Sequence, residues 1–199
     1  MGRKRSFDAD EAVRAARSVF WSNGYEGASL PDLEAATGLN RSSIYHTFGS
    51  KRGLFDAAVD SYLNEVIRPR LRVLLEDPVP PDAVRTYLTG LKAALLARAT
   101  ASSENGCLMV NTAVAPIAKE ESVRERIAAY RAEIAAALES GLSHQPDFDR
   151  SRVAPTAMAV TSLVVAAMTL TRVDSAAAAE TIDAALALVG AEAATSEAR

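Results

Sequence analysis

The sequence predicts an all-α fold, and three observations lead to that prediction. Hydrophobic residues make up 49% of the 199 residues, which is enough to build a core, whereas aromatic residues make up only 6%. Alanine, the strongest helix former, is abundant, so closely packed helices are favoured over sheets. No segment shows a strong period of two residues, the mark of a half-buried strand.

Charge and cysteine content narrow the class of protein. The formal net charge of −3 argues against a protein that coats DNA by charge alone. Residues 1–53 hold eight Lys/Arg and six Asp/Glu, a charge of +2, while the other residues hold fourteen and nineteen, a charge of −5. A slightly basic head on an acidic body fits a site-specific DNA binder better. The single cysteine, Cys107, and the lack of an apolar run after Arg5 lead us to expect a cytoplasmic protein without a signal peptide.

The first helix is predicted to begin near Asp8, which forms an N-cap with Glu11 as its reciprocal partner, and to end at Asn23-Gly24. Apolar residues at helical spacing indicate the side that enters the core, and we interpret Trp21 beside them as a packing residue. The residues of this stripe are Val13, Ala16 and Phe20.

The segment from Ser29 to Lys51 predicts two short helices joined by a tight turn. Ser29 is an N-cap candidate with Asp32 three residues later, and Pro31 suits the first turn because no amide hydrogen is needed there. Gly38 occupies the turn, where a residue without a side chain is favoured. Asn40 then caps a second helix over residues 41–48. Three apolar residues of this part have the spacing to pack back on the first of the two helices: Leu39, Ile44 and Phe48.

The other face of the second helix carries hydroxyl, aromatic and cationic side chains and no acidic one. Such a face can contact phosphates and base edges in the major groove of DNA, which admits one helix. An ordinary helical hairpin with a polar exposed face is the alternative. The outward-facing residues are Arg41, Ser42, Ser43, Tyr45, His46 and Thr47.

The rest of the chain predicts a connecting helix and a helical body. Ser50 caps a helix that continues to about Arg68, with Leu54, Phe55, Ala58, Tyr62 and Val66 on one side and Pro69 as a kink or an end. A proline-rich loop at 77–82 marks a boundary. We therefore expect a head at 1–50, a connecting helix at 51–76 and a body at 77–199. The expected body helices cover 83–100, 107–115, 122–141 (capped by Ser122), 151–172 and 175–188, with a break at 102–106 and a polar loop at 143–150.

One body segment, Val153 to Thr171, has the nineteen uncharged residues that could nearly span a bilayer. Several threonines and many alanines make it weakly hydrophobic for that role. We interpret it as a helix buried on most sides, in the core or in a subunit interface.

The wider string around the two short helices resembles a known family. G-Y-E-G-A-S-L followed by A-T-G-L-N-R-S-S-I-Y-H-T-F-G-S-K-R-G-L-F is similar to the DNA-binding domain of the tetracycline-repressor (TetR) family, over roughly residues 6–62. The preceding F-W-S-N-G-Y and the later Gly106-Cys107-Leu108 resemble one branch of that family.

The resemblance implies a ligand-responsive transcriptional regulator, most simply a repressor, that binds a pseudo-palindromic operator as a homodimer. It implies that Lys51 contacts a DNA phosphate and that the last two long helices pair with those of a second subunit. The basic residues 3–5 are either a minor-groove arm or a solvated terminus. The full set of expected DNA-binding residues is Arg3, Lys4, Arg5, Ser29, Asn40, Arg41, Ser42, Ser43, Tyr45, His46, Thr47 and Lys51.

A regulator of this kind needs a second site, for a small-molecule effector, and no cofactor. Candidates in the body are Tyr87, Cys107, Met109, Asn111, Thr112, Tyr130, Met158, Thr161 and Met168, although residues of these types are more often part of the core. No Gly-rich phosphate loop, metal-ligand spacing or G-x-S-x-G motif occurs. Two alternatives stay open: an enzyme or redox sensor that depends on Cys107, and a helical protein-interaction module that does not bind DNA.

Overall fold

The computed structural model describes residues 9–97 and 100–190, and these residues form helices and connecting turns without any strand, which confirms the all-α prediction. The helices are α1 (Ala9–Gly27), α2 (Leu30–Thr37), α3 (Arg41–Phe48), α4 (Lys51–Tyr62), α5 (Arg68–Leu71), α6 (Ala83–Leu96), α7 (Ala101–Asn105), α8 (Leu108–Ala113), α9 (Glu121–Ser143), α10 (Val153–Leu170) and α11 (Ser175–Gly190). A π turn, η1 (Leu63–Ile67), and three 3₁₀ turns, η2 (Arg72–Leu74), η3 (Pro116–Lys119) and η4 (Arg150–Arg152), lie between them.

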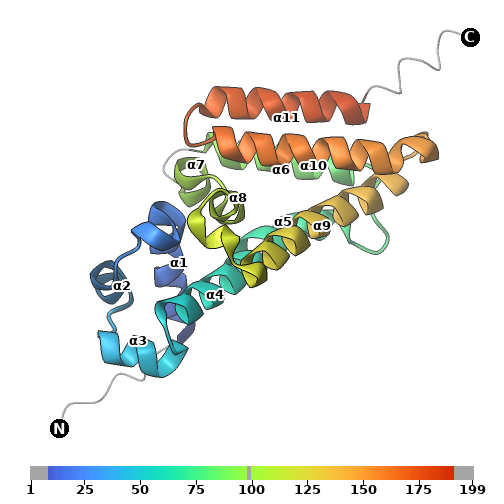
Figure 1. Ribbon diagram of the computed structural model, residues 1–199. Helices are drawn as coiled ribbons and strands as arrows, with labels where there is room; N and C mark the ends of the chain where they lie inside the picture. Colours follow the sequence, from blue (N-terminus) through green and yellow to red (C-terminus); the bar gives the residue numbers. More distant parts are fainter. Residues whose placement is uncertain (1–8, 98–99, 191–199) are drawn as a thin grey trace, which may run out of the picture.

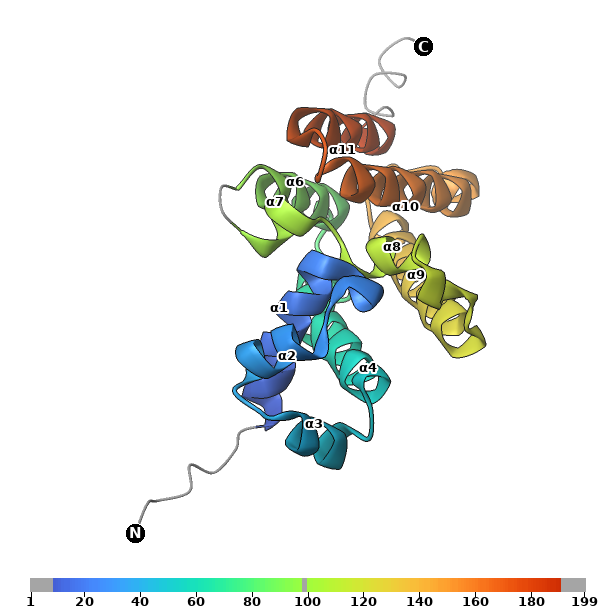
Figure 2. The ribbon, with the colours of Figure 1, turned by 60° about the vertical axis from the view of Figure 1, so that its left-hand side comes forward.

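The helices form a head and a body at opposite ends of an elongated molecule (Figure 1). Helices α1 to α3 and the start of α4 make the head, with α3 at its outer end. In the body, α10 packs between α9 and α11, and α11 also packs on α6. Figure 2 shows α7 and α8 beside α1, where the body meets the head.

The head is held together by aromatic and aliphatic side chains from all of its helices. The ring of Phe20 in α1 meets Phe55 of α4 edge-on, with 5.1 Å between the ring centroids. Leu33 of α2 and Ile44 of α3 are fully buried against this core. The backbone leaves the helical conformation at Gly24, at the predicted end of the first helix, and a further helical turn follows this kink to Gly27.

A continuous helical segment connects the head to the body. It extends from the start of α4 through η1 and α5 to the end of η2, beyond the predicted end near Arg68. The π turn η1 ends two residues before Pro69, and the amide of Arg68 donates to the carbonyl of Leu63, five residues back. Pro69 itself has no amide hydrogen to donate, so a change in the hydrogen-bond pattern here lets the segment continue.

Two predicted boundaries in the body are wrong for a local reason. Helix α6 ends at Leu96 rather than Thr100, and the predicted break at 102–106 contains the short helix α7. Thr100 is the N-cap of that helix: its Oγ1 accepts from the amide of Ser103 at 3.1 Å, and Ser103 Oγ accepts from the amide of Thr100 at 3.1 Å. A cap was therefore mistaken for the end of the preceding helix.

Helix α9 begins and ends differently from the prediction because of contacts with other elements. Its N-cap is Glu120, and the hydroxyl of Ser122 instead accepts a hydrogen bond from Arg52 in the head at 3.0 Å. Gly141 lies inside the helix. A Cβ atom on Gly141 would lie 2.6 Å from Cγ2 of Val84, so this glycine permits close packing on α6 rather than ending α9.

Helix α10 is long and apolar enough to cross a membrane by length and composition alone. Only 39% of its apolar window is buried, because α9 and α11 cover one side and the other side faces outward. Within one chain, then, α10 is covered on one side, and burial of its other side in a subunit interface stays a prediction. Met158, 61% exposed, lies on the uncovered side.

Candidate nucleic-acid interface

The two short helices of the head begin and end where local hydrogen bonds place them. Ser29 Oγ accepts from the amide of Asp32 at 3.2 Å, and the Asp32 carboxylate accepts from the Ser29 hydroxyl at 2.6 Å and from its amide at 3.1 Å. These hydrogen bonds, first the one from the Ser29 side chain, lower the pKa of Asp32. Gly38 ends α2 in the left-handed conformation, at φ 68°, so the chain turns toward α3.

The orientation of α3 is fixed by a cap at its start and by one buried face. Asn40 Oδ1 accepts from the amide of Ser43 at 2.9 Å, as the sequence predicts. Ile44 is fully buried, while Leu39 and Phe48 pack partly buried against the core. Because these apolar residues hold one side of α3, its remaining side chains face outward.

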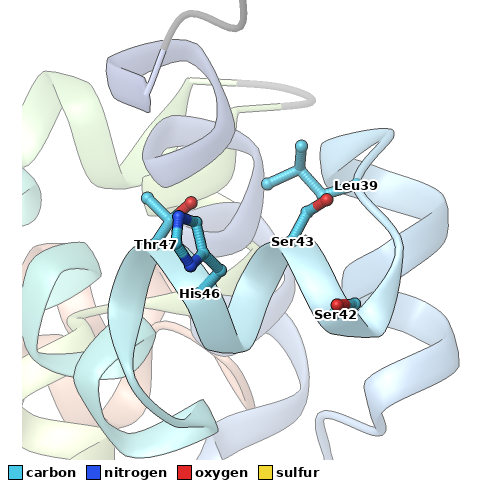
Figure 3. Close-up of a pocket in the computed structure, with 5 residues that line it drawn as sticks. All are labelled: Leu39, Ser42, Ser43, His46 and Thr47. Carbon is cyan, nitrogen blue, oxygen red and sulfur yellow. The ribbon is translucent and has the colours of Figure 1, made fainter.

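The outward face of α3 is polar, cationic and free of carboxylates. Arg41, Ser42, Tyr45, His46 and Thr47 are exposed, and Ser43 is partly exposed. The guanidinium of Arg41 lies over the ring of Tyr45, 5.6 Å from its centroid. Figure 3 shows Leu39, Ser42, Ser43, His46 and Thr47 along α3 and the turn before it, where they line a hollow of about 300 Å³.

Lys51, at the first position of α4, lies over an aromatic ring of α1. Its Nζ is 4.6 Å from the ring centroid of Tyr25, a cation–π arrangement. Burial is the main cause that raises the pKa of the Tyr25 phenol. The preceding residue, Ser50, caps α4 by accepting from the Gly53 amide at 3.0 Å, as predicted. Lys51 is thus held at the edge of the α3 face.

The remaining residues that were expected to contact DNA lie outside the outward face of α3. Arg3, Lys4 and Arg5, like the Asp8 cap, lie outside the described residues. The side-chain oxygens of Ser29 and Asn40 serve the helix caps, and so does the Ser29 amide, so a phosphate contact at these positions would involve the side-chain amide nitrogen of Asn40. No group of three or more His, Cys, Asp or Glu side chains that could hold a metal occurs within residues 9–97 and 100–190.

Most of the expected effector residues of the body are buried. Tyr87, Cys107, Met109, Tyr130 and Met168 are buried, and Cys107 Sγ lies 3.2 Å from the Tyr130 hydroxyl. The polar members are occupied by local bonds: Thr112 donates to the Leu108 carbonyl, Thr161 to the Ala157 carbonyl and Asn111 to the Asn105 carbonyl. Met158 lies apart, exposed on α10.

Sequence reasoning missed the polar contacts that join the head to the body. Arg52 of α4 pairs with Glu120, and Asp60 of the same helix pairs with Arg126 of α9 at 2.6 Å. In α1, Glu26 accepts from the amide of Ile117 at 2.8 Å. Each pair joins residues far apart in the chain, so no local sequence pattern predicts the contact.

Comparison with known proteins agrees with the resemblance seen in the sequence of the head and with the fold. A family model described as bacterial regulatory proteins, tetR family, matches residues 12–58. ComR, a helix-turn-helix transcriptional repressor of Escherichia coli (strain K12), is 32% identical over 111 residues, which are 55% of this chain and 51% of ComR. AcnR, a repressor of Corynebacterium glutamicum, is 38% identical over 85 residues, 39% of this chain and 45% of AcnR. The chain thus spans about half the length of these curated relatives.

Solved structures match over nearly the whole length. A cysteine-substituted form of the TetR-family regulator CifR, bound to 26-bp double-stranded operator DNA, has a TM-score of 0.76 at 30% identity, covering 92% of this chain and 98% of that chain. SCO4454, a TetR-family regulator from Streptomyces coelicolor, has a TM-score of 0.77 at 17% identity, covering 94% of this chain and 97% of its own, and this likeness shows the fold alone.

Proposed function

The chain belongs to the TetR family of bacterial regulatory proteins, and we propose that it is a ligand-responsive transcriptional repressor that binds operator DNA as a homodimer. The observation that carries the proposal is the exposed, carboxylate-free face of α3, held outward by the Asn40 cap and the buried Ile44. The likeness to an operator-bound regulator over 98% of its length supports it.

In the proposed complex, α3 lies in the major groove. Arg41, Ser42, Ser43 and His46 contact base edges, whereas Tyr45 and Lys51 contact phosphates and fix the register. The stacking of Arg41 on Tyr45 leaves the guanidinium at the tip of the head, where it can reach a guanine. Ser29, Asn40, Thr47 and the basic residues 3–5 complete the proposed contacts.

A homodimer is proposed from the outward sides of α10 and α11. Three of the large apolar side chains exposed in the described residues lie on these helices or in the turn between them: Met158, Val173 and Leu188, at 61%, 86% and 37% exposure. A second copy would cover them and place two heads on successive major-groove faces, about 34 Å apart. That spacing implies a pseudo-palindromic operator.

Regulation is proposed to pass from the body to the head along the connecting helix. We assign the head to residues 1–50, the connecting helix to 51–76 and the effector-binding and dimerising body to 77–199. An effector would favour a spacing of the heads that does not match the operator. Effector and DNA affinities are then reciprocally coupled, typically by about 1–3 kcal/mol.

We also place the chain in a branch defined by the F-W-x-x-G-Y and G-C-L motifs. The structure gives these motifs a reason to occur together, because Trp21 Nε1 donates to the carbonyl of Gly106 at 3.2 Å. Gly106 has a φ of 66°, and a Cβ there would lie 2.6 Å from the Met168 carbonyl oxygen. Only glycine fits that position without a shift of the backbone.

The test is binding of the purified protein to the DNA that flanks its own gene, followed by fluorescence anisotropy at fixed salt with excess non-specific competitor. We expect tight binding that Tyr45→Ala weakens, since Tyr45 supports Arg41 and faces the DNA. A random-sequence selection serves as a second arm, because the operator could lie elsewhere in the genome. Failure in both arms would favour the alternative of a protein-interaction module without DNA binding.

The remaining alternative, a Cys107-dependent enzyme or redox sensor, has less support. The Cys107 side chain is fully buried and lies beside the Tyr130 hydroxyl, so a substrate cannot reach it without rearrangement. The named relatives are transcriptional repressors.

A further inference from the structure

A cleft of about 350 Å³ lies where the head meets the body. Its walls come from α1, from the η1–α5 part of the connecting segment and from the start of α7, and its lining includes Trp21, Glu65, Arg70 and Ser102. Helix α7 packs on α1 at this place (Figure 2). The volume lies within the range of small-ligand sites.

The cation in this cleft has no acidic partner. The Nη2 atom of Arg70 donates to Ser102 Oγ at 2.9 Å, and Arg70 forms no ion pair with a carboxylate within residues 9–97 and 100–190. Other partly buried arginines of the molecule do, among them Arg17 with Glu65 and Arg52 with Asp56. A partly buried guanidinium without a counter-charge can bind an anion through charge-assisted hydrogen bonds.

A buried phenol packs against the tryptophan of the cleft. Tyr62 is fully buried, and its hydroxyl is the one buried side-chain polar atom without a hydrogen bond in the described part of the chain. Its ring lies edge-on to Trp21, with 4.9 Å between centroids. Burial, and after it the neighbouring Cys107, raise the pKa of Tyr62 well above the usual value, so the phenol stays neutral.

Among the described residues that line the cleft, Glu65 supplies the carboxylate, and it already has partners of its own. Glu65 accepts from Arg17 at 2.8 Å and from Ser61 at 3.3 Å. Desolvation acts to raise the pKa of Glu65, but the hydrogen bond and charge of Arg17 outweigh it and lower this pKa. Glu65 therefore stays ionised beside its own arginine and does not neutralise Arg70.

We propose that this cleft binds a small organic carboxylate with an apolar or aromatic body. The carboxylate accepts hydrogen bonds from Arg70 and Ser102, and the apolar body lies against Trp21 and Val66. The proposal rests on the proposed function in that it assigns this site and ligand class to the effector. Because the ligand contacts α1 of the head and α7 of the body together, its binding free energy depends on the position of the head relative to the body.

The chain offers its own probe, since Trp21 is its only tryptophan. Benzoate is titrated into the full-length protein while tryptophan fluorescence is followed, and benzamide, which has the same shape without the charge, is the matched ligand. We expect a saturable fluorescence change with benzoate, and binding of benzamide weaker by roughly tenfold or more because a charge-assisted hydrogen bond is lost. Equal response to both ligands, or no saturable response to benzoate, would overturn the proposal.

Variants distinguish binding in the cleft from a non-specific attraction of benzoate to positive charge. Arg70→Gln removes the cation from the cleft, whereas Arg72→Gln removes an exposed cation of the same segment that does not line the cleft. Benzoate binding is expected to be lost in the first and unchanged in the second, with Arg70→Lys keeping part of it. Equal losses in Arg70→Gln and Arg72→Gln would show a non-specific charge effect and contradict the site. Circular dichroism confirms that each variant is folded.

Operator binding, measured on the same preparations without benzoate, keeps the two proposals apart. Operator binding without a benzoate response overturns only the carboxylate site. A benzoate response without binding to any DNA overturns the repressor function and leaves the site standing, but no longer as an effector site.

Discussion

At the scale of single residues, the head separates side chains that hold it together from side chains that face solvent. Ile44 and Asn40 use their groups inside the protein, whereas Arg41 and His46 present theirs outward. Phosphate contacts position a protein on DNA, and base contacts select the sequence. The two kinds of contact therefore predict different results for different substitutions.

Arg41→Ala tests whether the Arg41 side chain contacts a base. If the guanidinium contacts a guanine, the variant loses about 1–3 kcal/mol of operator binding, and specificity relaxes at one base pair. Competition binding against operators with single substitutions measures both quantities. Arg131→Ala, an exposed cation on α9, is the control and leaves affinity unchanged. A uniform loss on all sequences would make Arg41 a phosphate contact instead.

Lys51→Ala tests a phosphate contact. The ammonium of Lys51 is placed by the Tyr25 ring at the first turn of α4, where free amides also attract anions. Its loss should weaken binding to any DNA and reduce the slope of log K against log salt by about one. Affinity measured at several salt concentrations gives the slope, and an unchanged slope removes Lys51 from the interface. Lys119→Ala, exposed in the body, provides the comparison.

Residue-scale predictability follows the range of the interaction. The caps at Ser29, Asn40 and Ser50 were predicted because a cap joins residues only three positions apart. The contact of Lys51 with Tyr25 was not, since it joins α4 to α1 through the folded core. For the same reason Arg70, which has no motif around it, was absent from the expected effector residues.

At the scale of elements, the junction between α3 and α4 is set by close backbone contact. Gly53, in the first turn of α4, faces the end of α3: a Cβ there would lie 2.0 Å from the carbonyl oxygen of Phe48. No side-chain rotation relieves a clash with backbone, so the two helices would have to separate. The position of the DNA-contacting face thus depends on this glycine.

Two glycine-to-alanine variants should accordingly act in opposite directions. Gly53→Ala is expected to lower the free energy of unfolding and to weaken operator binding, because α3 shifts against α4. Gly90→Ala, inside α6 with no atom within 4 Å of its added Cβ, should raise stability by about 0.5–1 kcal/mol through helix propensity. Urea unfolding monitored by circular dichroism measures both. Equal stabilisation by the two substitutions would contradict the close contact at Gly53.

The existence of most elements was predictable, but several of their ends were not. Periodic apolar residues and prolines located α6, α9, α10 and α11 because these signals are local. The end of α9 was misplaced because Gly141 has the sequence signature of a helix end, while its position is explained by packing on Val84. The π turn before Pro69 likewise has no sequence signal that distinguishes it from a kink.

At the scale of the whole molecule, head and body share a core but are also joined by polar contacts at their boundary. Arg126 bonds Asp60, Glu26 bonds the Ile117 amide, and Trp21 bonds the Gly106 carbonyl. An exposed ion pair such as Arg126–Asp60 contributes only about 0.2–1 kcal/mol, so it can exchange partners at low cost. This arrangement suits a head whose position responds to the body. A ligand in the cleft at Arg70 would contact both parts and so change that position.

The proposed dimer is tested by placing a charge on the outward side of α10. In Met158→Glu the carboxylate would be buried in the interface without a partner, so the dimer should dissociate while the subunit stays helical. Val114→Glu, at a position 86% exposed between α8 and η3, adds the same charge away from α10 and α11 and should leave the dimer intact. Sedimentation at micromolar concentration measures the oligomeric state of both variants.

The same pair of variants predicts the effect on DNA. A monomer binds one half-site and loses the gain from simultaneous binding of two heads, which reaches about 10²–10⁴ in affinity for linked modules. Met158→Glu should therefore lose most of its operator affinity although Met158 lies at the far end of the molecule from α3 and every proposed DNA contact is retained. A Met158→Glu protein that remains dimeric would place the subunit interface elsewhere. A monomer with unchanged operator affinity would instead show that one head is sufficient, and the requirement for a pseudo-palindromic operator would fall with it.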